Sequence, residues 1–210
     1  MNEAHERLCS SAGWAEYLSG DVLPRVLASV SLGDHLLEVG PGFGMATDAL
    51  RTKVSQITVV EANEEYATSL AKRLEGANVA VEVGDATALP YEDASFTSAA
   101  SFTMLHHVPS SDLQNDLLAE VARVLGPGGV FVGSDSLDSP GFRGFHEGDV
   151  CNPLAPEDLA NRLAAVGFDD VTVTGEWTSQ EREDEVHGTM FFVAHVPVGR
   201  ERRRQPRRTV

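Results

Sequence analysis

Three glycines alternate within residues 38–44, directly after a short apolar stretch. Glycines at this spacing let a backbone turn tightly and approach a bound ligand closely. The acidic residue that precedes them is unsuited to a pyrophosphate and suits a ligand with a cationic ammonium group. The segment therefore predicts a cofactor site that includes Glu38, Gly40, Pro41, Gly42 and Gly44.

Two more acidic residues follow the next two expected strands. Glu61, with Ala62 after it, ends one strand, where a carboxylate can accept hydrogen bonds from ribose hydroxyls. Asp85, followed by Ala86, comes after the next strand, where it can accept from an adenine amino group. Each of these alone is explained as well by a solvated strand end or a turn. Their shared position at one edge of a sheet favours an adenosine-containing ligand.

The glycine spacing also separates two classes of nucleotide. Hydride-transfer cofactors bind to G-x-G-x-x-G, whose last glycine lies at a helix start that faces a pyrophosphate. Here the pattern is G-x-G-x-G, and Met45 occupies that last position. This departure disfavours a nicotinamide-dependent oxidoreductase, which remains the alternative enzyme class. A non-catalytic module that binds the cofactor is a further alternative.

Taken together, these motifs resemble the class I S-adenosylmethionine-dependent methyltransferases. Residues 88–96, 105–107 and 120–129 resemble the small-molecule enzymes of ubiquinone and menaquinone biosynthesis, although Thr97 replaces an aspartate common there. The resemblance spans residues 33–135. It implies S-adenosylmethionine as cofactor, with its methionine part near Glu38, its ribose near Glu61 and its adenine near Asp85; Ser101, which ends the fourth expected strand, joins this cofactor set.

Histidines are the candidate catalytic residues. Methyl transfer from a sulfonium needs a general base only where the acceptor must lose a proton, and histidine suits that role near neutral pH. His106 follows the fourth expected strand, and His146 lies in an aromatic loop, residues 141–147. Alternatively, His106 caps a helix or contacts the cofactor. His146 could equally be an ordinary loop histidine with no role in catalysis. The histidines are scattered along the chain, so we expect no metal site.

The elements that position these residues alternate between strand and helix patterns. Parallel strands joined by helices predict an α/β fold, doubly wound, whose mostly parallel seven-stranded sheet has helices on both faces and an antiparallel last strand. In such sheets ligands bind beyond the carboxyl ends of the strands. The expected strands are 35–39, 56–60, 79–83, 96–101, 130–133, 171–174 and 189–196, and the helices 3–18, 45–53, 64–75, 112–125 and 156–166.

The chain length suits one methyltransferase domain over residues 1–198. We expect an N-terminal helical lid (1–30), a cofactor-binding core (33–135) and a substrate-side segment with the last strands (136–198). Residues 199–210 contain six arginines and predict a basic flexible tail.

Composition narrows the partners. The net charge of −16 disfavours nucleic acid, because phosphate backbones require a basic surface. There is no run of 18 apolar residues and no secretory pattern at the start, so neither a membrane partner nor export is expected. With only two cysteines in 210 residues, a cytoplasmic location is the default. We therefore expect a small-molecule acceptor, apolar or aromatic, methylated on O, N, S or C, and the oligomeric state stays open.

Overall fold

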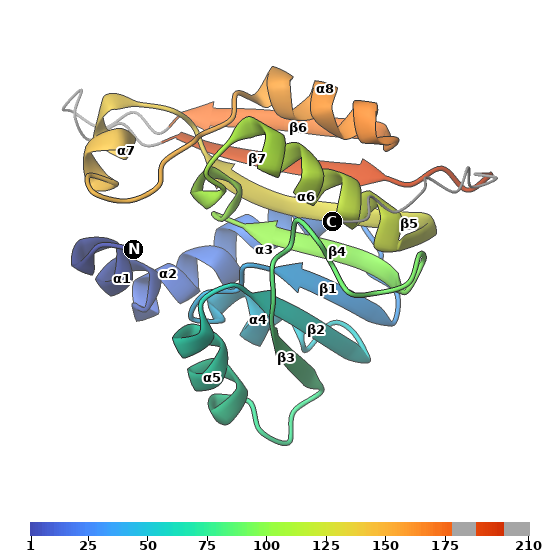
Figure 1. Ribbon diagram of the computed structural model, residues 1–210, viewed down its shortest axis with the longest axis horizontal. Helices are drawn as coiled ribbons and strands as arrows, with labels where there is room; N and C mark the ends of the chain where they lie inside the picture. The colour runs from blue at the N-terminus through green and yellow to red at the C-terminus, as the bar shows by residue number, and fades with distance from the viewer. Residues whose placement is uncertain (178–187, 200–210) are drawn as a thin grey trace.

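A computed structural model describes residues 1–177 and 188–199 of the chain. In these residues one seven-stranded sheet has the order β3-β2-β1-β4-β5-β7-β6 (Figure 1). The pairs among β1 to β5 are parallel, and β7 runs antiparallel to both of its neighbours. The predicted fold class is confirmed. The strands are β1 (His35–Val39), β2 (Gln56–Glu61), β3 (Val79–Val83), β4 (Phe96–Phe102), β5 (Leu125–Ser136), β6 (Asp169–Trp177) and β7 (Gly188–His195).

Helices cover both faces of the sheet. On one face, α6 (Ser111–Val124) and α8 (Pro156–Val166) bury leucines in a core that includes Phe131 and Phe192. On the other face, α3 (Leu23–Leu27), α4 (Met45–Leu50) and α5 (Glu64–Arg73) pack against β1, β2 and β5. A short helix, α7 (Pro140–Phe145), follows β5. It lies at the same end of the sheet as the N-terminal helices (Figure 1).

The single helix expected over residues 3–18 is wrong in detail. The chain forms α1 (Glu3–Cys9) and α2 (Ala12–Tyr17), followed by a π-helical turn, Leu18–Val22, that leads into α3. The break has a local cause, because the Ser11 hydroxyl accepts a hydrogen bond from the Trp14 amide and thereby starts a new helix. The resulting bend lets α1 reach across the end of the sheet.

The strand expected to begin at residue 130, after a helix ending at 125, begins earlier, because β5 already starts at Leu125. Phe96 pairs with Leu125 and Ser98 with Val130, so the glycine-rich stretch is a large bulge in the strand. Its backbone is satisfied by the last strand: the Gly128 amide donates to the Val196 carbonyl at 2.9 Å. The bulge therefore belongs to the sheet.

Residues 178–187, between β6 and β7, and residues 200–210, which make up nearly all of the expected basic tail, lie outside the described ranges. Within those ranges, none of the helices combines the length and the apolarity needed to cross a bilayer.

Candidate active site

A cavity of about 590 Å³ opens beyond the carboxyl ends of β1 to β4. Here the order of the strands reverses between β1 and β4, which is where doubly wound sheets bind their ligands. Most of the predicted cofactor residues line this cavity together: Glu38, Gly40, Pro41, Gly42, Glu61, Ala62, Asp85 and Ala86.

Gly44 and Ser101 do not line the cavity. Gly44 begins α4 with φ of 78°, and a Cβ atom there would collide with the Leu70 side chain, so this glycine serves the turn and the packing of α5. Ser101 is fully buried within β4, and its hydroxyl has no hydrogen-bond partner. Its neighbour Phe102 reaches the cavity wall instead.

The two glycines of the loop that line the cavity have different roles. Both have positive φ, 64° at Gly40 and 54° at Gly42. A Cβ atom on Gly40 would collide with the Met104 side chain, which also lines the cavity. A Cβ atom on Gly42 would meet no atom within 4 Å. Gly42 therefore presents bare backbone to open space, as a ligand cradle requires.

Glu61 is held in place by the loop that it faces. Its Oε2 atom accepts a hydrogen bond from the Gly42 amide at 3.0 Å, and its Oε1 atom accepts from the Asn63 amide at 2.9 Å. A carboxylate oxygen has two lone pairs, so each oxygen keeps one for a further donor such as a ribose hydroxyl. The side chain is preorganised for that contact.

Glu38 is a buried acid with an unusual pKa. Its side chain is 1% exposed, and the Thr47 hydroxyl donates to Oε2 at 2.7 Å. The pKa of Glu38 is raised to about 7, above all by burial; the carboxylates of Asp48 and Glu61 also raise it, and the hydrogen bond from Thr47 lowers it. A cationic ligand group would offset both the cost of burying a charged carboxylate and its repulsion from Asp48 and Glu61. The site therefore fits the ammonium group of S-adenosylmethionine.

Asp85 forms a turn that leaves one of its oxygens available. Its Oδ1 atom accepts from the amide and the hydroxyl of Thr87, both at 2.8 Å. The exposed side chain lines the cavity at the end of β3, opposite the glycine loop. Its Oδ2 atom is thus the candidate acceptor for an adenine amino group.

The N-terminal helices supply a wall of the cavity that the sequence did not indicate in detail. His5 and Cys9 of α1 line it, as do Trp14 of α2 and Leu18. A hydrogen bond of 2.6 Å from the Tyr66 hydroxyl to Glu6 joins α5 to α1 across the opening. The sequence predicted a lid over residues 1–30, but it did not say which of its side chains reach the cavity.

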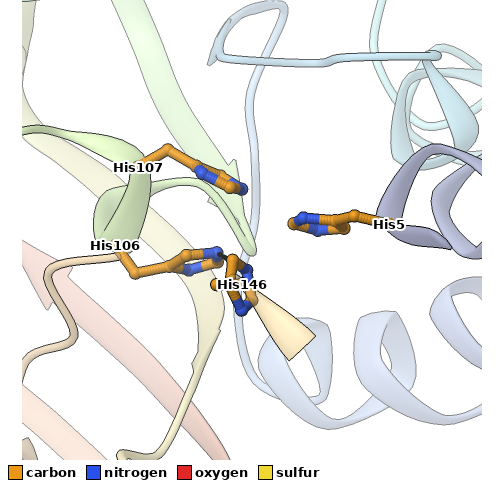
Figure 2. Close-up of side chains that lie close together, drawn as sticks. All are labelled: His5, His106, His107 and His146. Carbon is orange, nitrogen blue, oxygen red and sulfur yellow. Dashed lines mark hydrogen bonds between the residues drawn. The ribbon is translucent and has the colours of Figure 1, made fainter. Parts of the chain in front are cut away.

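The candidate catalytic histidines lie behind the cavity wall. His106 is 1% exposed and His146 is 3% exposed, and their Nε2 atoms are 3.2 Å apart. His107 and His5 line the cavity in front of them (Figure 2). The histidines are scattered along the sequence, but the fold gathers four of them, so their spacing in the sequence is no argument against a metal site.

An aspartate that the sequence did not single out supports this group. Asp135, at the end of β5, accepts from His106 Nδ1 at 2.5 Å. Burial opposes ionisation of Asp135, but His106 beside it holds the pKa of that carboxyl below its usual value. Its position at the carboxyl end of a parallel strand was the available signal.

Comparison with known proteins agrees with this geometry. Residues 37–133 match a family described as a methyltransferase domain. The O-methyltransferase cnsE of Penicillium expansum is 32% identical over 171 residues, which cover 74% of this chain and 60% of that protein. The 27-O-demethylrifamycin SV methyltransferase of Amycolatopsis mediterranei is 36% identical over 159 residues, 72% of this chain and 53% of that one.

The chain belongs to the class I S-adenosylmethionine-dependent methyltransferases. The cofactor of this methyltransferase family is S-adenosylmethionine, as the resemblance implied. The fold agrees with that of a phosphoethanolamine N-methyltransferase of Haemonchus contortus, with a TM-score of 0.73 at 19% identity over 92% of this chain and 56% of that one. The chain spans little more than half the length of the curated relatives named here.

Proposed function

We propose that this methyltransferase transfers a methyl group from S-adenosylmethionine to an oxygen atom of a small, largely apolar acceptor. One observation carries the proposal: the buried carboxylate of Glu38 and the preorganised carboxylate of Glu61 face the same cavity from adjacent strands. The oxygen as acceptor atom is supported by the relatives, three of which are named as O-methyltransferases.

The residues divide into a cofactor side and an acceptor side. Glu38 would hold the ammonium group, Glu61 the ribose and Asp85 the adenine. Bound S-adenosylmethionine supplies an already activated methyl group. The chain therefore needs chiefly to orient the acceptor and exclude water.

The acceptor side is the apolar part of the cavity wall. Its members are Phe102 at the end of β4, Met104 just after it, Leu113 and Leu117 of α6, and Val150 after α7. Trp14 of α2 covers the cavity from the N-terminal side, so residues 1–30 are proposed as a lid. This lining supports an apolar or aromatic acceptor in preference to a nucleic acid, as does the net charge of −16.

A pair of matched glycine variants tests the cofactor site. Gly42 and Gly76 both have positive φ and no atom within 4 Å of the position that a Cβ atom would occupy, but only Gly42 lines the cavity. Gly42→Arg should abolish binding of S-adenosylmethionine and S-adenosylhomocysteine in calorimetry, while Gly76→Arg should bind them like the wild type. Both carry the same kind of backbone strain, so their melting temperatures provide the control.

The acceptor is then sought by release of S-adenosylhomocysteine from a panel of phenols, alcohols, carboxylic acids, thiols, amines and short RNAs. We expect turnover with an oxygen acceptor that Gly42→Arg eliminates. Failure of the wild type to bind either adenosyl ligand at millimolar concentration would refute the proposal. Tight binding of NADH instead would favour an oxidoreductase. Turnover only with amines, thiols or RNA would refute the assignment to oxygen.

A further inference from the structure

Four histidine side chains meet at one end of the cavity (Figure 2). They come from three separate segments: His5 from α1, His106 and His107 from the 3₁₀ turn Leu105–His107 after β4, and His146 from the end of α7. One ring nitrogen of each lies within 4.8 Å of those of the other three. Three of the side chains are buried, and His107 is half-buried. Imidazoles that converge in a mostly buried region, and not on a solvated surface, require an explanation.

The two deepest rings have a fixed orientation. The Nδ1 atom of His106 lies 2.5 Å from Asp135 Oδ1, and that of His146 lies 2.8 Å from the Phe142 carbonyl oxygen. A carbonyl or carboxylate oxygen only accepts, so Nδ1 carries the hydrogen in both rings. In a neutral ring the lone pair is then on Nε2.

His107 follows the same pattern, because its Nδ1 atom lies 3.2 Å from the Val150 carbonyl oxygen. The Nδ1 atom of His5 lies 3.7 Å from Asp149 Oδ2, within reach of its charge but too far for a hydrogen bond. Three of the four rings are thus held through Nδ1 with Nε2 available, and His5 has no hydrogen bond at Nδ1. A ring held through Nδ1 by a carboxylate or carbonyl, with Nε2 available, is the usual arrangement of a metal-binding histidine.

The Nε2 atoms of His106 and His146 are only 3.2 Å apart. Two lone pairs facing each other at this distance repel, unless a cation lies between them. A proton would bridge these two nitrogens and leave the other two rings unused. A metal ion would use all four, and tetrahedral metal–nitrogen bonds of about 2.0–2.1 Å place the nitrogens roughly 3.3 Å apart.

We propose that His5, His106, His107 and His146 bind one divalent transition-metal ion, with zinc the best match. The widest pair of nitrogens would have to approach by at most about 1.5 Å from the observed 4.8 Å. An all-imidazole ligand set suits zinc and its neighbours and disfavours magnesium and calcium, which prefer oxygen. Asp135 and Asp149, behind two of the rings, supply negative charge to balance the ion.

The site would be structural, because four protein ligands leave no open position on a tetrahedral ion. Its effect is to fasten α1 to the core beside the cavity, since His5 is the only ligand from the N-terminal helices. His5 and His107 both line the cavity, so the ion would fix one part of its wall. This role is separate from the methyl donor and does not depend on the identity of the acceptor.

The test uses the full chain without a polyhistidine tag, stripped with chelator and titrated with Zn²⁺ or Co²⁺. We expect one ion per chain by elemental analysis and the visible absorption of tetrahedral Co²⁺. His5→Gln and His146→Gln should weaken Zn²⁺ binding at least 100-fold. His195→Gln, a substitution outside the cluster near the end of β7, should bind like the wild type.

A second measurement distinguishes fastening of α1 by the metal ion from simple loss of folding. Zn²⁺ should slow amide hydrogen exchange in residues 3–9 of the wild type and leave it unchanged in His5→Gln. The metal-free melting temperatures of His5→Gln and wild type are compared first, so that packing lost at this buried side chain is separated from loss of the metal. No saturable binding by the wild type, or equal binding by His5→Gln and wild type, would overturn the proposal.

Discussion

Cofactor affinity should depend on the protonation state of Glu38. The pKa of this buried carboxyl is about 7, so about half of the unliganded protein has it ionised at pH 7 and about 3% at pH 5.5. Only the ionised form pairs with an ammonium group, and the apparent dissociation constant scales inversely with the competent fraction. Affinity for S-adenosylmethionine should therefore fall about 15-fold from pH 7 to pH 5.5. An α-amino group titrates near pH 7.7–8.0, so the ligand stays protonated throughout this window.

Glu38→Gln is the matched variant, because it keeps the size of the side chain, the Thr47 contact and every other titrating group. It should bind more weakly at pH 7 and lose this pH dependence. Calorimetry in buffers of different ionisation enthalpy should show that the wild type releases close to one proton on binding at pH 5.5. Equal pH profiles for both proteins would refute the role of Glu38.

The same pKa shift has a consequence for folding. A carboxyl group with a pKa of about 7 in the folded state and 4.5 unfolded binds more protons when folded, so stability falls as pH rises between these values. The full difference is about 3 kcal/mol at about 1.4 kcal/mol for each pKa unit. Relative to Glu38→Gln, the unliganded wild type should lose this amount between pH 4.5 and pH 7.5 in urea titrations. A constant difference would contradict the assigned pKa.

Four further substitutions test packing and contacts. Gly133→Ala places a methyl group against β4 and the Phe192 ring and should cost about 3 kcal/mol in urea unfolding, whereas Gly144→Ala in α7 has open space and should gain up to about 1 kcal/mol. Glu61→Ala should weaken S-adenosylmethionine binding at least tenfold by calorimetry, since hydrogen bonds to a charged group contribute about 1.5–3 kcal/mol. Tyr66→Phe removes the hydrogen bond between α5 and α1 and should cost about 1 kcal/mol, measured by thermal melting; no change would show that this bond contributes nothing to stability.

Much of the fold follows from local patterns. The strands are short and apolar, and each is followed by a helix or a turn, so their number and the antiparallel last strand were predictable. The positions of Glu61 and Asp85 were predictable because Glu61 ends β2 and Asp85 lies two residues past β3, and the carboxyl ends of parallel strands share an edge. The bulge at residues 126–129 was not predictable, since glycines also form turns. Only the hydrogen bonds to the chain at the end of β7 distinguish a bulge within a strand from a turn before it.

The histidine group was beyond local reasoning. His5 and His146 are 141 positions apart in the sequence. Nothing in the pattern of residues 3–9 says that α1 crosses the cavity to meet α7. Ser101 shows the opposite error: it has the expected position along β4, but its side chain is enclosed within the sheet. Position along a strand is read from sequence more easily than the surroundings of a side chain.

The contact between the chain's first residues and α7 sets an order of events during synthesis. The Asn2 side-chain amide donates to the Phe145 carbonyl at 2.9 Å, and the Asn2 backbone amide donates to Asp149 Oδ2 at 2.8 Å. A ribosome adding 5–20 residues each second needs roughly 7–30 s to reach these partners. Until then α1 lacks its contacts with α7, although the strands from β1 to β4 precede α7 in the chain and are synthesised earlier. The cavity is therefore completed late, and a nascent chain can acquire its sheet well before it can retain a cofactor.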